Sequence, residues 1–183
     1  GLMVLTALGQ VPSEAVSSPD TLTVPHWLIA GPLPIGSREG LVDPIWPQDP
    51  ASLVPSAGDS LESMMAAGGW VHWRATAGEK DKVPFAYDGI DWDALSDQWG
   101  GAGLMCAGLA WGTFEVREPG AYRIEALGIG SLYIDGRRHV GNPYPRGAFA
   151  PPVRLRAGRH RVLLRVSGLG PRESYFRLVR MDG

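Results

Sequence analysis

The sequence predicts an all-β fold, an antiparallel β-sandwich with one or two short helices. Apolar and polar residues alternate over 132–135, 153–156 and 174–181, and a period of two is typical of half-buried strands. The chain of 183 residues contains 25 glycines and 16 prolines, which favour many turns and short strands over long helices. Asp135-Gly136 and Ala157-Gly158 predict two tight turns, because glycine tolerates positive φ and aspartate hydrogen-bonds its own backbone.

Further strands are expected over 21–30, 69–76, 106–116 and 121–127, each bounded by glycine or proline. Gly31-Pro32 is expected to end the first of them. Asp59 and Ser60 resemble the N-cap of a short helix that the glycines at 68 and 69 would end. One further helical turn is expected after Asp91.

The composition divides the chain into residues 1–20 and a β-sandwich domain over 21–183. The apolar stretch 2–8 followed by a polar linker reads as the remnant of a secretory signal peptide, or else as an edge strand. Seven apolar residues are too few to span a membrane. The sequence therefore predicts no membrane span.

The charge pattern argues against nucleic acid as a partner. The net charge is -2, whereas nucleic-acid binding needs clustered basic charge to neutralise phosphates. The basic residues of the alternating segments near the C-terminus are predicted to form a solvated strand face. These residues are Arg154, Arg156, Arg159, Arg161 and Arg165.

The single cysteine, Cys106, excludes an internal disulfide, and its apolar neighbours predict a buried, inert thiol. This is compatible with either the cytoplasm or a bacterial envelope.

One string looks catalytic. Residues 58–61, Gly-Asp-Ser-Leu, match the block that names a class of esterases, with Ser60 as the nucleophile. An esterase core needs alternating strands and helices, and Pro55 interrupts the strand that would precede the serine. Asp135 and His139 are one residue too far apart for the Asp-x-x-His pair that would supply the base. A helix cap at Ser60 is the preferred interpretation.

Metal sites have little support, and no cofactor is predicted. The four histidines, His26, His72, His139 and His160, show neither a His-x-His pair nor helical spacing. Four acids cluster around Gly89, and an oxygen-rich loop of this kind can hold a structural calcium ion. A position in a turn or at a helix N-cap explains each of these acids equally well. The four are Asp88, Asp91, Asp93 and Asp97.

The aromatic residues give the candidate binding site. Trp27, Trp73 and Trp111 lie in apolar strand contexts and are predicted to be core. Aromatic side chains in loops can stack on a sugar ring while nearby polar groups bind its hydroxyls, or they can pack in a seam between domains. The loop aromatics chosen as ligand-binding candidates are Trp46, Trp92, Trp99 and Tyr144.

Four short motifs resemble the galactose-binding-like jelly rolls attached to secreted enzymes. Residues 26–34 resemble the W-x-hydrophobic-x-G-P-F-P start of such modules, with Leu33 in place of phenylalanine, and 71–73 resemble their V-x-W strand. Residues 90–92 and the Gly-Asn-Pro-Tyr at 141–144 resemble two later segments. Such domains occur at the N-terminus of secreted bacterial α/β-hydrolases and peptidases, and in family 2 glycoside hydrolases.

The resemblance implies a noncatalytic accessory module of a larger secreted or periplasmic bacterial hydrolase. Its partner would be carbohydrate or the catalytic domain of the same polypeptide. Two alternatives stay open. One is a stand-alone esterase-like hydrolase using Ser60, and the other is a self-assembling structural module of the bacterial envelope.

Overall fold

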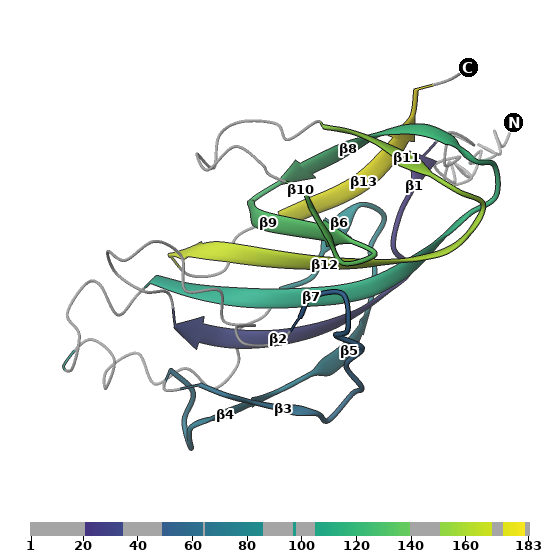
Figure 1. Ribbon diagram of the computed structural model, residues 1–183. Helices are drawn as coiled ribbons and strands as arrows, with labels where there is room; N and C mark the ends of the chain where they lie inside the picture. Colours follow the sequence, from purple (N-terminus) through teal and green to yellow (C-terminus); the bar gives the residue numbers. More distant parts are fainter. Residues whose placement is uncertain are drawn as a thin grey trace, which may run out of the picture.

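The computed structural model describes residues 21–34, 49–63, 65–85, 97, 105–139, 151–169 and 174–181. Its strands form two larger antiparallel sheets and one separate hairpin (Figure 1). The prediction of an all-β sandwich is confirmed. No helix in the described part of the chain is long and apolar enough to cross a membrane.

The first sheet has five strands in the order β1-β13-β8-β11, with β6 beside β13. Their bounds are Thr21–Leu22 (β1), Lys82–Val83 (β6), Gly120–Leu127 (β8), Pro152–Leu155 (β11) and Ser174–Arg180 (β13). The second sheet has six strands in the order β10-β9-β12-β7-β2-β5. Their bounds are His26–Pro34 (β2), Arg74–Ala77 (β5), Met105–Val116 (β7), Ile129–Ile134 (β9), Arg137–His139 (β10) and Gly158–Leu169 (β12). The hairpin consists of Ser60–Glu62 (β3) and Trp70–His72 (β4).

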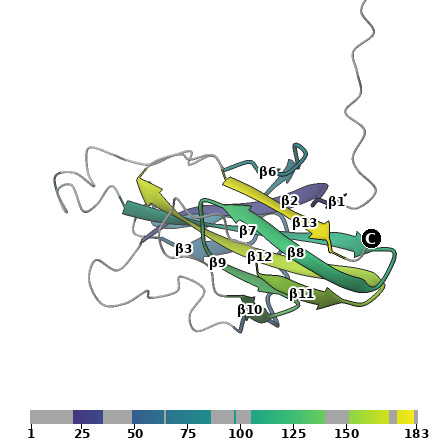
Figure 2. The ribbon, with the colours of Figure 1, turned by 90° about the horizontal axis from the view of Figure 1, so that it is seen from above.

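The main core lies between the two larger sheets, which face one another (Figures 1 and 2). Both sheets contribute alternate side chains to it, as period two requires. Trp27 from β2 meets Phe176 from β13 edge to face, with ring centroids 6.1 Å apart. Trp27 is therefore a core residue, as predicted.

Part of the six-stranded sheet is buried on both faces. On β9, Leu132 and Ile134 belong to the main core, whereas Tyr133 faces the other way and is also buried. The hairpin β3–β4 and the segment before it cover this second face, below β2 and β5 in Figure 1. A second apolar cluster results, which contains Trp73 from the predicted core set, with Trp111 half-buried against it.

Two connections cross between the sheets at one end of the sandwich. The chain passes from β7 to β8 and from β11 to β12, while β7 pairs with β12 and β8 pairs with β11. Tyr122 stabilises the first corner, because its hydroxyl donates a hydrogen bond to the carbonyl oxygen of Glu118 at 2.7 Å. The predicted turn at Ala157-Gly158 forms the second corner.

The predicted tight turn at Asp135-Gly136 is confirmed and joins β9 to β10. Both residues have positive φ, 50° and 79°, as the type I′ hairpin turn requires. A Cβ on Gly136 would lie 2.2 Å from the Cβ of Ala51, so glycine is also needed for the close approach of the segment that covers the sheet.

Two expectations about local structure are wrong, and a third is not tested. Residues 60–62 form β3 and not a capped helix, because Leu61 faces the second cluster and strand pairing with β4 satisfies the backbone. Gly31-Pro32 does not end β2, which continues to Pro34 through an irregularity between Ala30 and Leu33. The helical turn expected after Asp91 lies outside the described residues.

The predicted solvated arginine face holds only in part. Arg154, Arg156 and Arg159 are exposed, and Arg161 is half-buried. Arg165 is only 4% exposed, because it lies between β7 and β9 on the buried second face of the six-stranded sheet. Alternation alone could not indicate that this face is covered.

Candidate functional site

The outer face of the β3–β4 hairpin presents four exposed side chains. Successive residues of a strand point to opposite faces, so Leu61 and Val71 face the second cluster while their neighbours face solvent. Trp70 is 54% exposed, which is unusual for so large an apolar side chain. The four residues, which we call the hairpin face, are Ser60, Glu62, Trp70 and His72.

Strand register places the hairpin face in two directly opposed pairs, Glu62 with Trp70 and Ser60 with His72. Backbone hydrogen bonds join Trp73 N to Asp59 O at 2.8 Å and Ser63 N to Gly69 O at 2.9 Å, which brackets the two pairs. Both are therefore non-hydrogen-bonded positions, where Cα atoms are roughly 4.5 Å apart and side chains are closest. The side chains of Glu62 and Trp70 therefore leave the hairpin next to one another on the same face.

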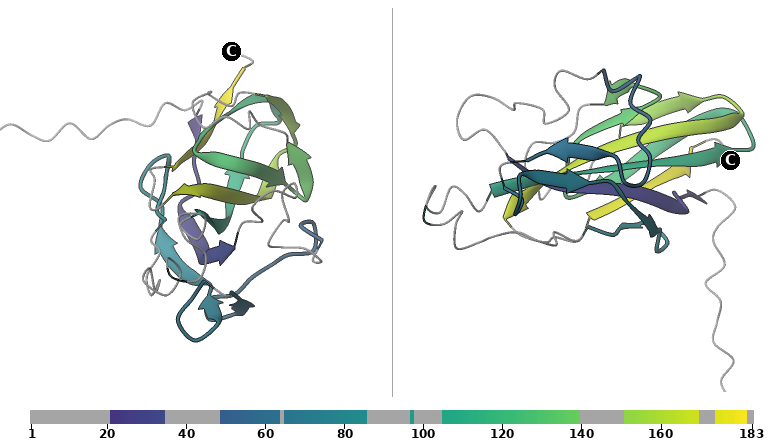
Figure 3. Two further views of the ribbon diagram at one scale, coloured as in Figure 1. Left: turned by 90° about the vertical axis from the view of Figure 1, so that its left-hand side faces the viewer. Right: turned by 90° about the horizontal axis from the view of Figure 1, so that it is seen from below.

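The hairpin is fixed to the sandwich by more than apolar contact. The buried hydroxyl of Ser63 donates a hydrogen bond to the carbonyl oxygen of Pro32 on β2 at 2.5 Å, and accepts one from Met65 N at 3.3 Å. Met65 is itself buried beside this contact. The hairpin is thus tied to β2, and it lies at the edge of the molecule (left view in Figure 3).

Ser60 Oγ and His72 Nδ1 are 3.0 Å apart, which is within reach of a nucleophile and its base. Both residues are exposed strand neighbours, and direct cross-strand pairs of this kind commonly hydrogen-bond. No acid of the described residues hydrogen-bonds His72, and an acyl-transfer site also needs donors for the oxyanion. Within the part of the chain that the structure describes, the Ser60–His72 pair alone therefore lacks both an acid that orients the histidine and donors that stabilise the oxyanion.

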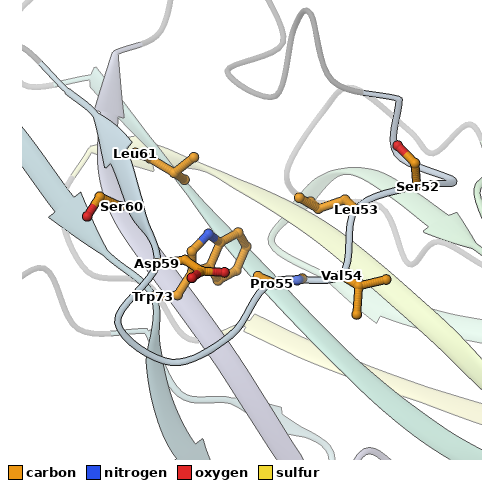
Figure 4. A pocket seen from close by; sticks show the side chains of 8 residues that line it. All are labelled: Ser52, Leu53, Val54, Pro55, Asp59, Ser60, Leu61 and Trp73. Carbon is orange, nitrogen blue, oxygen red and sulfur yellow. The ribbon is translucent and has the colours of Figure 1, made fainter.

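A groove of about 550 Å³ runs between the segment 52–55 and the start of the hairpin. Leu53 and Leu61 face one another across it, and the Trp73 ring lies at its centre (Figure 4). Trp73 is only 2% exposed, so it offers an edge and no face for stacking. Ser60 also lines the groove, with its hydroxyl pointing away from Leu61, so the groove adjoins the hairpin face at this residue (Figure 4).

Asp59 is held at the rim of this groove by a turn. Its carboxylate accepts a hydrogen bond from Ser56 N at 2.7 Å, and its own N–H donates to Ser56 O at 3.1 Å. A smaller cavity of about 300 Å³ lies between β5 and the segment at Pro84 and Phe85. Neither cavity is lined by Trp70.

The four aromatic residues predicted to bind ligand, Trp46, Trp92, Trp99 and Tyr144, lie outside the described residues. The structure therefore does not test them. Asp88, Asp91 and Asp93 of the possible calcium loop lie outside as well, and within the described ranges no group of three potential ligands could hold a metal ion.

Trp70 is the exposed aromatic residue that the sequence reasoning missed. The signal was present, because Trp70, His72 and Arg74 alternate with Val71, Trp73 and Ala75. Once Val71 and Trp73 are assigned to the core, Trp70 must face solvent. The predicted exposed aromatic residues all lie in expected loops, whereas Trp70 lies on a strand.

No protein-family model matches the chain, and no curated protein matches it. Two solved structures are similar in the course of the backbone. A β-glucosidase from Kluyveromyces marxianus in complex with glucose is 11% identical, with a TM-score of 0.42 over 85% of this chain and 16% of that one. An α-xylosidase from Xanthomonas citri is 12% identical, with a TM-score of 0.38 over 88% and 19%. The chain thus spans less than a fifth of either enzyme.

Proposed function

We propose that this chain is a noncatalytic β-sandwich module that binds carbohydrate through the hairpin face. The observation that carries the proposal is the exposed Trp70 ring on a rigid strand, with Glu62 and the Ser60–His72 pair beside it. The C–H face of a sugar ring stacks on an indole, and neighbouring polar side chains bind its hydroxyls.

The composition of the hairpin face supports binding over glycoside hydrolysis. A glycosidase uses two carboxyl groups that flank the scissile bond. On the hairpin face only Glu62 carries a carboxyl group, and Asp59 lies at the rim of the adjoining groove. An accessory role in a larger secreted bacterial hydrolase is part of the proposal and rests on the sequence motifs at 26–34 and 141–144.

The test is isothermal titration calorimetry with soluble oligosaccharides, together with depletion assays on insoluble polysaccharides. Trp70→Ala is expected to weaken binding by about tenfold or more, since ring stacking and buried area are lost together. Val54→Ala is the matched control, because Val54 is equally exposed but lies away from the hairpin face. Unchanged binding in Trp70→Ala, or no binding by the wild type, would refute the proposal.

The 3.0 Å contact between Ser60 and His72 favours a second candidate, an esterase-like hydrolase. Turnover of short-chain acyl esters by the wild type, abolished in both Ser60→Ala and His72→Ala, would support it. Trp70→Ala should then leave the turnover largely unchanged. Absence of turnover in the wild type leaves the Ser60–His72 pair as a cross-strand hydrogen bond. For the third alternative, a self-assembling envelope module, sedimentation velocity over a range of concentrations is the direct test.

A further inference from the structure

Glu62 lies directly opposite Trp70 on the hairpin face. Both side chains are exposed, and Glu62 forms no ion pair with any described residue. Elsewhere on the surface, Glu125 and Glu118 are occupied by arginines. The negative charge at the hairpin face is therefore available to a ligand.

We propose that the hairpin face prefers an amino sugar, whose protonated amine lies between the Trp70 ring and the Glu62 carboxylate. This inference rests on the proposed carbohydrate-binding function and names its ligand class. A carboxylate only accepts hydrogen bonds, and an ammonium group only donates them. A charge-assisted hydrogen bond is roughly twice as strong as a neutral one. A cation above an indole face gains further attraction from the ring quadrupole.

Among the described residues, the other charged or titratable groups near the hairpin face lie away from Trp70 and Glu62, so they leave this end of the face to a cation. His72 lies diagonally across from Glu62 and is hydrogen-bonded to Ser60. Arg74 follows at the start of β5, on the far side of His72 from Trp70. Two residues of strand span roughly 6.6 Å. A cation beside Trp70 and Glu62 is therefore at least one such step away from His72 and from Arg74. Glu62 would repel the carboxylate of a uronic acid or the sulfate of a sulfated sugar at this position.

The test compares β-1,4-linked tetramers of glucosamine, glucose and N-acetylglucosamine by calorimetry, in a buffer that protonates the glucosamine amine. Glucose replaces the amine by a hydroxyl, and N-acetylation removes its charge. The wild type is expected to bind the glucosamine tetramer about tenfold more tightly than the glucose tetramer, as an added charge-assisted contact implies. The preference should shrink at high salt, because the contact is exposed.

Three variants separate the contributions. Glu62→Gln should lose most of the preference for the glucosamine tetramer and keep at most the smaller part that the Trp70 ring supplies, with glucose binding close to that of the wild type. Glu79→Gln is the matched control, because Glu79 is an exposed acid outside the hairpin face, and it should keep the preference. Trp70→Ala should lose binding of every tetramer.

Equal binding of the glucosamine and glucose tetramers by the wild type overturns the amino-sugar inference and leaves carbohydrate binding intact. A preference of undiminished size in Glu62→Gln, or its disappearance in Glu79→Gln, overturns it as well. If the wild type binds none of the tetramers and no other glycan, the proposed function fails and the inference fails with it.

Discussion

The imidazole of His160 is joined to the carboxylate of Asp135, with Nδ1 and Oδ2 2.6 Å apart. Its other ring nitrogen, Nε2, lies 2.9 Å from the carbonyl oxygen of Arg156. Both partners are acceptors, so the ring satisfies both only as the imidazolium, with a proton on each nitrogen. The ring also stacks on Phe114, with centroids 5.6 Å apart. One side chain thus links the β9–β10 turn to the corner between the sheets.

Stability should fall as the pH rises above neutrality. Burial alone lowers the pKa of His160, but the hydrogen bonds to Asp135 and Arg156 and the negative charges of Asp135 and Glu115 outweigh it and raise the pKa above its ordinary value. A histidine whose pKa is raised in the folded state stabilises the fold. The stabilisation is complete below the unfolded-state pKa of about 6.5, and it is lost as the pH rises through the folded-state pKa.

Urea denaturation at a series of pH values measures this effect. Wild-type stability should decline from about pH 6.5 upward, and the decline should be absent in His160→Gln. Asp135→Asn should weaken the pH dependence while keeping the turn, since asparagine also tolerates positive φ. A decline of the same size in His160→Gln would show that another group is responsible.

Gly136→Ala should destabilise the fold more than Gly68→Ala. Both glycines have positive φ, 79° and 85°, so alanine costs about 1 kcal/mol at either position from backbone strain. At Gly136 the new methyl group also meets Ala51, whereas at Gly68 nothing lies within 4 Å. Overpacking of this kind costs about 1–3 kcal/mol more. Thermal or urea unfolding of the pair measures the difference, and equal losses would contradict the close approach of the 51–55 segment.

Ser63→Ala should lower the free energy of unfolding by about 1–3 kcal/mol, because it leaves the buried Pro32 carbonyl oxygen without its hydroxyl donor. It should also weaken glycan binding, since Ser63 fixes the hairpin to β2. Ser60→Ala is the control for stability, because the exposed serine should cost less than about 0.5 kcal/mol. A Ser63→Ala variant as stable as Ser60→Ala would mean that packing of the hairpin alone holds it in place.

Glu125→Gln should cost less than about 1 kcal/mol at neutral pH, because its partners are largely solvated and water screens the attraction. Burial alone raises the pKa of Glu125, but the hydrogen bonds and charges of Arg177 and Arg123 lower it overall. A carboxyl group whose pKa is lowered in the folded state stabilises the fold at pH values above its unfolded-state pKa. This stabilisation disappears as the pH falls through the folded-state pKa. The stability difference between wild type and variant should therefore vanish in acid, as urea denaturation can show.

The sequence by itself determined most of the longer strands and the tight turns. Alternation marked β11 and β13, and Asp135-Gly136 marked the β9–β10 turn, because side-chain period and permitted φ are local properties of the chain. The alternation over residues 70–75 also indicates that Trp70 is exposed, although Trp70 is not among the predicted ligand-binding residues. The hydrogen-bonding role of Asp135 was anticipated only for its own turn, and its partner His160 is 25 residues away.

Only the tertiary structure decided which faces are covered and which distant residues meet. Alternation at Arg165 indicates a strand, but its burial depends on whether that side of the sheet is covered, which is a property of the whole fold. Ser60 carries good cap chemistry, yet Leu61 and Val71 gain more by closing the second cluster, so residues 60–62 form a strand. The pairing of Glu62 with Trp70 likewise follows from register, which is set by packing across the fold and by no single residue type.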